Sequence, residues 1–207
     1  MGRKSTARER ILNSAKDLFH SRSTASVGIA EICVEAGVKK GSLYHFFPSK
    51  EHIVLAVIDA QLDAMKAEEF EPAFKNDIPP LARFQRFFVA SMERMQSDAC
   101  CYAGCPIGNL IAELGSQDPK IRERLSACLD EIQAIFERTL LEAVEVGELP
   151  KATNPVALAG TLLALIQGIA IVAKATDDPV RVATIGAQAL QLLGLGSAVP
   201  KKTRGPG

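Results

Sequence analysis

Residues 28–52, GIAEICVEAGVKKGSLYHFFPSKEH, decide the fold of the N-terminal part of this chain. Ile29 and Ile32 lie on one face of a first short helix. Gly37 follows within Ala-Gly-Val and can take the positive φ that ends a helix, and Pro48 blocks the continuation of a second helix. Two helices joined by a glycine turn form a helix-turn-helix, a motif that places its second helix in the major groove of DNA.

The flanking residues extend this motif on both sides. Thr6 and Glu9 have the spacing of a capping box, which predicts that a helix begins just after Thr6. Ser49 can cap a further helix with Glu51 in its first turn, and apolar spacing continues that helix to about residue 70. The sequence therefore predicts three short helices followed by a long one.

Charge is distributed unevenly although the 207-residue chain carries 24 Lys and Arg against 24 Asp and Glu. Residues 1–58 hold nine basic and five acidic residues, a net charge of +4, so the remainder carries −4. A basic end on an acidic body fits a protein that binds a polyanion by one end. Chance variation of surface charge is the alternative, and the motif favours DNA binding.

Composition predicts a helical protein. Trp is absent and the aromatic residues are nine Phe and two Tyr, so aliphatic side chains must fill the core. Leu, Ala, Glu, Ile and Lys dominate between prolines, which favours an all-α fold. No apolar leader follows Met1, and five cysteines are an odd number, so we expect a cytoplasmic protein with free thiols.

The sequence offers little that an enzyme would need. All three histidines (His20, His45 and His52) lie in the basic N-terminal part, away from any Ser/Asp partner set. No metal-ligand cluster and no phosphate-binding glycine loop is present in the sequence. We therefore expect no enzymatic activity, no cofactor and no metal.

The stretch AGVKKGSLYHFFPSKE, from Ala36 to Glu51, resembles the signature of the TetR family of repressors. The resemblance to the DNA-binding half of that family covers about residues 7–58. It implies an all-α fold with an N-terminal three-helix DNA-binding domain, residues 1–52, and a C-terminal helical domain for effector binding and dimerisation, residues 53–196. Residues 197–207, rich in Gly, Pro and basic residues, are expected to form a disordered tail.

The chain departs from the family pattern at four positions. Lys39 replaces a small hydroxyl residue that commonly caps the recognition helix. Val27 and Gly28 stand where hydroxyl residues usually cap the preceding helix, and Ser23 stands where glycine is usual. We therefore predict no side-chain phosphate contact from Val27 or Gly28.

Candidate DNA contacts lie along the second helix of the motif and just after it. Gly41 lets the backbone approach DNA, whereas Lys40 and Ser42 can reach base edges or phosphates. The resemblance implies phosphate binding by Tyr44 and Lys50. The predicted DNA-binding residues are Lys40, Gly41, Ser42, Tyr44, His45 and Lys50. Packing of the Tyr44 ring in the core, and a capping or packing role for His45, remain alternatives, and Leu43, Phe46 and Phe47 are expected to hold the helix in place.

The C-terminal half is expected to form helices over about residues 77–97, 107–114, 118–146, 155–175 and 177–195. The last two of these are the predicted dimer surface, because small residues every four positions allow close approach and the final helix has an apolar stripe. The predicted interface residues are Gly160, Ala164, Gly168, Val182, Ile185, Ala189 and Leu193. Burial of these stripes within the chain is the alternative.

A possible effector site is indicated by Gly104 to Glu113, GCPIGNLIAE, which resembles the motif GC-x-x-GNL-x-x-E of one subgroup of TetR-like ligand domains. Asn109 and Glu113 are i,i+4 neighbours on one face of a short helix, so they must pair with each other, with another helix or with a ligand. The predicted effector residues are Phe84, Phe88, Met92, Cys105, Asn109, Glu113 and Gln167. The aromatic and Met residues among them can equally be core.

Cys100, Cys101 and Cys105 form a cluster near the same place. A thiolate at a loop-helix junction can sense oxidants or electrophiles, and an inert thiol is the alternative. The spacing C-C-x3-C lacks a fourth ligand and a nearby His, so a zinc site is not expected.

We interpret the chain as a homodimeric, one-component transcriptional repressor that binds a palindromic DNA operator and is released by a small-molecule or electrophile effector. Two rival functions are a helical scaffold anchored in a membrane by the apolar residues 156–173 and a small-molecule enzyme. Neither rival explains residues 28–52, so we expect no membrane partner.

Overall fold

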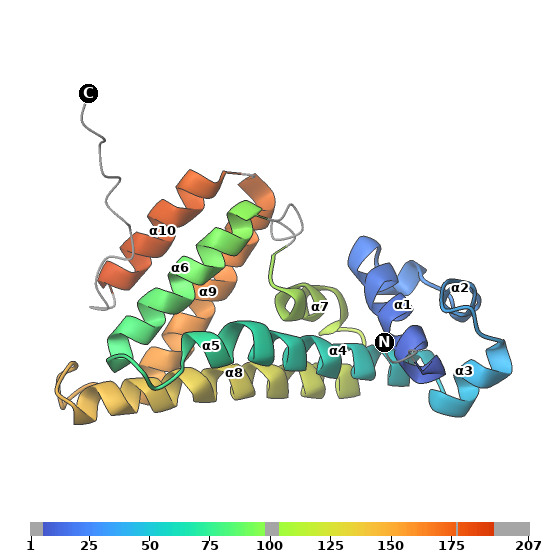
Figure 1. Cartoon of the computed structure of the whole chain (residues 1–207), viewed down its shortest axis with the longest axis horizontal. Helices are drawn as coiled ribbons and strands as arrows, with labels where there is room; N and C mark the ends of the chain where they lie inside the picture. Colours follow the sequence, from blue (N-terminus) through green and yellow to red (C-terminus); the bar gives the residue numbers. More distant parts are fainter. Residues whose placement is uncertain (1–5, 98–103, 177, 193–207) are drawn as a thin grey trace, which may run out of the picture. The chain divides into compact units, whose positions relative to one another are not determined.

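The computed structural model describes residues 6–97, 104–176 and 178–192, and every regular element within these ranges is a helix (Figure 1). The predicted basic tail, Leu193, Cys100 and Cys101 lie outside the described residues. The helices are α1 (Ala7–Ser21), α2 (Ile29–Glu35), α3 (Lys40–Phe46), α4 (Lys50–Met65), α5 (Glu71–Ala73), α6 (Pro80–Ser97), α7 (Pro106–Leu114), α8 (Pro119–Glu145), α9 (Pro155–Thr176) and α10 (Pro179–Leu192). The all-α prediction is confirmed.

The chain divides into two compact units that do not follow its linear order. The first unit contains Met1–Asp63 and Pro106–Cys128, and the second contains Ala64–Cys105 and Leu129–Gly207. The first unit thus joins α7 and the start of α8 to the N-terminal helices. The division of the chain at residue 52 stays a prediction.

In the first unit, α1 begins with the predicted capping box. The Glu9 amide donates to Thr6 Oγ1 at 3.2 Å, and the Thr6 amide donates to Glu9 Oε2 at 2.7 Å. Ile11 and Ala15 are fully buried on the inner face of the helix. After α1, a 3-10 turn over Thr24–Ser26 occupies part of the segment that the sequence indicated as a polar loop.

The turn between α2 and α3 has the predicted geometry. Gly37 has φ +62°, which confirms the expected left-handed residue. Gly28 and Lys39 are the N-cap residues of α2 and α3, and neither helix has a side-chain capping bond. Arg10 Nε on α1 donates to the Ala36 carbonyl at 3.1 Å, so α1 helps to hold the turn.

Leu43 and Phe47 attach α3 to the core of this unit, as predicted, and both are buried. The prediction for Phe46 is wrong, because its side chain is 37% exposed. Phe46 is the last residue of α3 and Phe47 follows in extended conformation, with φ −134°. This change of backbone turns Phe47 inward and leaves Phe46 outside.

The helix after Pro48 begins at a Ser49 cap, as expected, since Ser49 Oγ accepts a hydrogen bond from the His52 amide at 3.4 Å. Two ion pairs hold the first turns of α8 against α4. Lys120 Nζ lies 3.2 Å from Glu51 Oε1, and Arg124 Nε lies 2.6 Å from Asp59 Oδ1.

In the second unit, the chain continues from α4 through a π-helical segment, Lys66–Phe70, into α5. Its core is an aromatic cluster in which ring centroids lie 5.1 to 6.4 Å apart. The members of this cluster are Phe70, Phe74, Phe84, Phe87, Phe88 and Phe136. Aromatic rings, and not aliphatic side chains alone, therefore fill this part of the core.

Arg83 on α6 is the most buried charge of the second unit, at 3% exposure. It ion-pairs with Glu142 on α8 at 2.6 Å, donates to the Ile78 carbonyl at 3.0 Å and bonds the Asn76 side chain. A buried guanidinium needs such a complete set of acceptors. Arg83 therefore joins α6, α8 and the segment between α5 and α6.

α10 packs against both α6 and α9 in the second unit (Figure 1). α9 is the one helix among the described residues that is long and apolar enough to cross a membrane by length and composition, with a mean hydropathy of 2.3. Only 28% of its most apolar window is buried within the chain. Core helices of soluble proteins meet the same two criteria.

Candidate functional site

The outer face of α3 presents four of the predicted DNA-binding residues to solvent. Lys40, Gly41, Tyr44 and His45 are exposed, and Ser42 is half-buried. Tyr44 is 42% exposed, so its ring is at most partly buried, and the DNA-binding role of Tyr44 stays a prediction. This short helix therefore leaves these polar and basic side chains in solvent, while Leu43 is fully buried.

Contacts along this helix orient the exposed side chains. Lys40 Nζ lies 5.9 Å from the centroid of the Tyr44 ring, a cation–π contact one helical turn apart. The ring of His45 meets the Phe46 ring edge-on at 5.0 Å. Phe46, which sequence reasoning placed in the core, thus supports an exposed imidazole instead.

Gly41 occupies an open position on this face. A Cβ atom added there would meet nothing within 4 Å in the chain. Packing inside the protein therefore does not require glycine at this position. Close approach of the backbone to DNA at Gly41, which the missing side chain allows, stays a prediction.

Lys50, in the first turn of α4, lies half-buried beside the same motif. Its Nζ donates to the carbonyl oxygen of Thr24 at 2.6 Å. An ammonium group has three protons, so this bond fixes the position of the group and leaves protons for a phosphate oxygen. The N-terminus of α4 adds its own positive end at that place.

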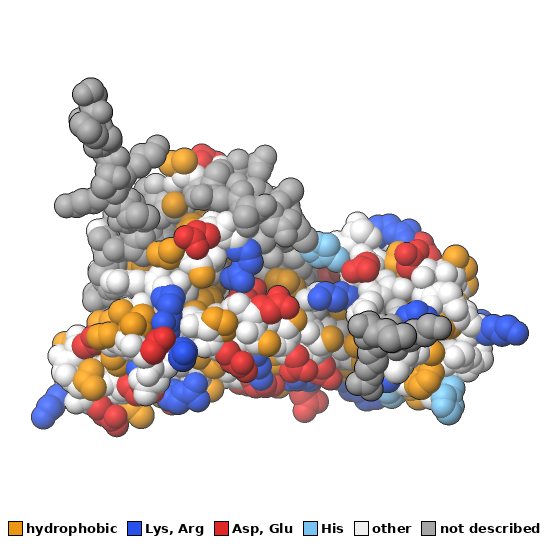
Figure 2. Space-filling view, in the orientation of Figure 1, with side chains coloured by type: hydrophobic (Ala, Val, Ile, Leu, Met, Phe, Trp, Pro, Cys, Tyr) orange, Lys and Arg blue, Asp and Glu red, His pale blue; other side chains and the backbone are white. Residues whose placement is uncertain are grey.

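Basic and acidic side chains are scattered over the part of the chain that holds α1 to α3, as Figure 2 shows. An ion pair between Arg22 and Glu31 joins the end of α1 to α2. The hydrogen bond from Arg22 keeps the pKa of the Glu31 carboxyl below its usual value. Glu31 therefore stays ionised in the ordinary pH range, and it offsets one positive charge near the motif.

The predicted effector residues are divided between the two compact units. Asn109 and Glu113 on α7 belong to the first unit, whereas the other five belong to the second. Phe84 and Phe88 are buried in the aromatic cluster, and Met92 is half-buried. Cys105 and Gln167 lie in contact, with Gln167 Nε2 3.6 Å from Cys105 Sγ.

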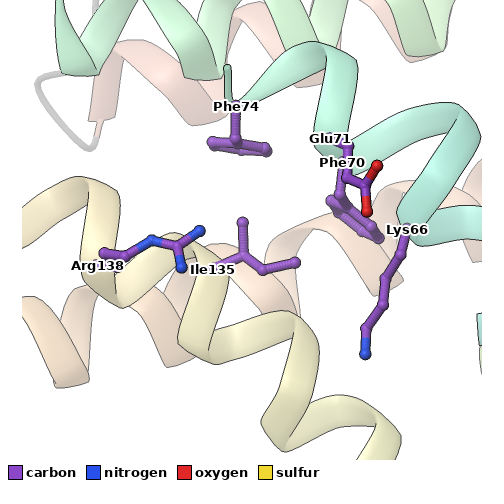
Figure 3. Close-up of a pocket in the computed structure, with 6 residues that line it drawn as sticks. All are labelled: Lys66, Phe70, Glu71, Phe74, Ile135 and Arg138. Atoms are coloured by element: carbon purple, nitrogen blue, oxygen red, sulfur yellow. The ribbon is translucent and has the colours of Figure 1, made fainter. Parts of the chain in front are cut away.

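One pocket in the second unit has a volume of about 330 Å³. Its lining residues are Lys66, Phe70, Glu71, Phe74, Ile135 and Arg138 (Figure 3). Figure 3 shows Ile135 between the side chains of Arg138 and Lys66. Lys66 is already ion-paired with Glu131. None of the seven predicted effector residues lines this pocket.

Glu113 bonds to the loop between α1 and α2, a contact that the sequence did not indicate. Its carboxylate accepts hydrogen bonds from Ser23 Oγ at 2.8 Å and from Thr24 Oγ1 at 3.4 Å. Sequence reasoning left open whether Glu113 pairs with another helix or a ligand. The departure from glycine at Ser23 was the one signal that could have drawn attention to this loop.

The predicted dimer residues have different surroundings within a single chain. Ala164 and Gly168 on α9 are exposed, and Gly160 faces the side chain of Gln133. Val182 and Ala189 on α10 are buried within their own chain. Side chains that are already buried add little area to an interface, so a pairing surface at this end of the chain would draw mainly on α9.

Metal binding has no support among the described residues, which contain no group of three or more His, Cys, Asp or Glu side chains able to hold an ion. Cys33 and Cys128 are buried thiols outside any disulfide among the described residues, and Cys105 is a half-buried one.

The exposed second helix and the left-handed turn before it place this chain in the helix-turn-helix class of DNA-binding proteins. The sequence matches the family described as "Bacterial regulatory proteins, tetR family" over residues 11–57 and "Tetracyclin repressor-like, C-terminal domain" over residues 80–188. The chain belongs to the TetR family of bacterial transcriptional regulators. Members of this family bind DNA, dimerise through the C-terminal domain and are not enzymes.

Named relatives agree with this assignment. The transcriptional regulator AcuR of Cereibacter sphaeroides is 33% identical over 156 residues, which is 75% of this chain and 70% of AcuR. The transcriptional repressor DhaR of Mycobacterium sp. strain GP1 is 28% identical over 164 residues, which is 78% of this chain and 79% of DhaR. The crystal structure of a TetR regulatory protein from Rhodobacter sphaeroides is 28% identical, with a TM-score of 0.75, and covers 92% of this chain and 98% of that protein.

Proposed function

We propose that this protein is a dimeric repressor that recognises a palindromic operator through α3 and responds to a small-molecule or electrophile effector. The observation that carries the proposal is the exposed face of α3, where Lys40, Gly41 and Tyr44 have no role in the core. DhaR, a relative over most of the chain, is named a repressor. A repressor of this kind acts in the cytoplasm.

The DNA contacts follow from the chemistry of each group. Lys40 and Ser42 at the start of α3 suit base edges or phosphates, and Tyr44 and Lys50 suit phosphates. His45 stands at the end of the same face. One such helix reads too few base pairs to be selective, so the two-fold symmetry of a dimer requires a palindromic site.

The test is to let the purified protein select duplexes from a random pool and to measure its affinity for the selected site by fluorescence anisotropy across a salt series. We expect a palindromic consensus, tight binding and a steep loss of affinity with salt. Equal affinity for the selected and a scrambled duplex would contradict operator recognition.

Matched variants separate the recognition face from the rest of the unit. Tyr44→Phe removes one hydroxyl and Lys50→Gln one charge, and both should weaken binding. Glu35→Gln at the exposed end of α2 adds no predicted DNA contact and serves as the control. Unchanged affinity in both Tyr44→Phe and Lys50→Gln would assign the DNA contacts to other residues.

Dimerisation is proposed to use α9 and α10 in a four-helix bundle with the same helices of a second chain. Ala164 and Gly168 are exposed on the apolar α9, and a second backbone can approach closely there. Gly168→Glu should convert a dimer into a monomer in analytical ultracentrifugation. A dimer that persists in this variant would place the interface elsewhere.

For the effector, the contact between Cys105 and Gln167 supports an electrophile-responsive site. Cys105 is a half-buried thiol one residue before the start of α7. Treatment with N-ethylmaleimide should release the selected operator from the wild type and leave a Cys105→Ser variant bound. Equal release from both would exclude Cys105 as the responsive thiol, and release from neither would favour a non-covalent effector.

A further inference from the structure

Glu113 on α7 accepts three hydrogen bonds from the loop between α1 and α2. Glu113 Oε1 accepts hydrogen bonds from Ser23 Oγ at 2.8 Å and from the Ala25 amide at 3.4 Å. Glu113 Oε2 accepts a third from Thr24 Oγ1 at 3.4 Å. Glu113 and the loop belong to the same compact unit although about 90 positions separate them in the chain.

The loop is also held from its other side, by a predicted DNA contact. Thr24 is 2% exposed, and its carbonyl oxygen accepts the bond from Lys50 Nζ at 2.6 Å. The Thr24 hydroxyl meets Glu113, while the Thr24 backbone meets Lys50. A displacement of this loop therefore moves the acceptor that sets the position of the Lys50 ammonium group.

The three bonds connect the two family domains. Ser23, Thr24 and Ala25 lie in the matched DNA-binding region, residues 11–57, whereas Glu113 lies in the matched C-terminal region, residues 80–188. The shortest bond comes from Ser23, which stands where the TetR signature usually has glycine. A glycine could not make this bond, so the full set of contacts depends on a residue that departs from the usual family pattern.

We propose that Glu113 is a positioning residue for DNA binding, which fixes the Ser23–Ala25 loop and, through Thr24, the Lys50 ammonium group. Hydrogen bonds to a carboxylate are stronger than neutral ones, which suits a group that must hold a short loop. The expected effect of Glu113 on DNA affinity rests on the proposed operator binding. The expected effect of Glu113 on the order of the loop does not.

The loop itself is tested first, by hydrogen exchange of the full-length protein without DNA. Glu113→Gln keeps the size of the side chain but removes its negative charge, so the bonds from Ser23, Thr24 and Ala25 are no longer charge-assisted. We expect faster exchange in the peptide that contains Ala25. Glu123→Gln removes an equal charge from an exposed site on α8 in the same unit and should exchange as the wild type does. Equal exchange in both variants would overturn the proposal.

The effect on DNA is tested next, with the duplex selected by the wild-type protein, at a temperature where every variant is folded. We expect Kd to rise about tenfold in Glu113→Gln, which corresponds to the loss of one or two charge-assisted hydrogen bonds. Glu123→Gln should leave Kd unchanged. A merely structural role would lower Tm and leave Kd unchanged, which would also overturn the proposal.

A double variant shows whether the serine and the carboxylate act together. Ser23→Ala should raise Kd by a smaller factor, and Ser23→Ala with Glu113→Gln should raise it no further than Glu113→Gln alone. Factors that multiply would show independent actions and contradict the contact. Failure of the wild type to prefer any duplex would contradict operator recognition instead, and the exchange experiment would still decide the role of Glu113.

Discussion

α3 and α6 carry the same kinds of side chains and use them in opposite ways. On α6, Arg83 is 3% exposed with three acceptors, and Phe84 is fully buried. On α3, Lys40 is exposed against the ring of Tyr44, and Phe46 is 37% exposed. Cations and rings satisfied within the chain stabilise the fold, whereas those left outside on a fixed helix are available to a partner.

The largest effect should come from the buried ring. Phe84→Ala should lower the free energy of unfolding by about 4 kcal/mol, since it leaves a cavity beside Phe74 and Phe136. Phe46→Ala on α3, by contrast, should cost less than about 1 kcal/mol. Urea denaturation of both variants measures the difference. Similar losses would show that exposure does not separate the two helices.

The second largest effect on stability should come from the buried guanidinium of Arg83. Arg83→Met should lower the free energy of unfolding by about 3 kcal/mol, because Glu142, Asn76 and the Ile78 carbonyl lose their donor together. The affinity of the folded protein for its selected duplex should not change. Urea denaturation and anisotropy of the same sample check the two statements. A change in Kd without a change in stability would contradict the view that Arg83 on α6 serves the fold and not DNA binding.

On α3 a substitution should act with opposite signs on stability and on DNA binding. Gly41→Ala should stabilise the protein by up to about 1 kcal/mol, since alanine favours a helix and its Cβ meets nothing in the chain. The same methyl group should weaken operator binding about tenfold, about 1.4 kcal/mol, because it stands between backbone and DNA. Thermal unfolding and anisotropy measure the pair. Unchanged affinity would show that the backbone at this position stays clear of DNA.

The smallest effect concerns Glu69, which lies within the π-helical segment and pairs with Arg94 at 3.2 Å. Burial raises the pKa of the Glu69 carboxyl above its usual value of 4.5, although Arg94 opposes the shift. The folded state then holds this proton more tightly than the unfolded state, so stability falls as pH rises from 4.5 through the raised pKa. Glu69→Gln should remove this decline and be slightly more stable than the wild type at neutral pH in urea denaturation. A lower stability at neutral pH would show that the ion pair outweighs burial.

Local chemistry made much of the first unit predictable. The capping box at Thr6, the left-handed Gly37 and the stop at Pro48 depend on residues a few positions apart. Such features can be read directly from sequence. The prediction for Phe46 failed because this residue lies next to the apolar stripe in the sequence. Only the backbone change at Phe47 decides which of the two rings turns inward.

Contacts between distant residues were beyond sequence reasoning. The bonds of Glu113 with Ser23 and Thr24 join positions about 90 residues apart, and no periodicity records such a pair. The acceptor of Arg83 on α8, Glu142, also lies far along the chain, 59 positions away. The π-helical segment also went unpredicted, since its residues fit an α-helical pattern until packing places Phe70 in the aromatic cluster.

If the exposed apolar side of α9 is the pairing surface, as proposed, the activity of this protein depends on its concentration. Family members pair through the C-terminal domain, so folding and pairing of this chain form one linked equilibrium. At low expression, where single chains prevail, the population of paired chains grows with roughly the square of chain concentration. For the proposed dimeric repressor, a twofold change in synthesis should then alter operator occupancy more than twofold while the operator is far from saturated, a steeper response than a monomeric regulator gives.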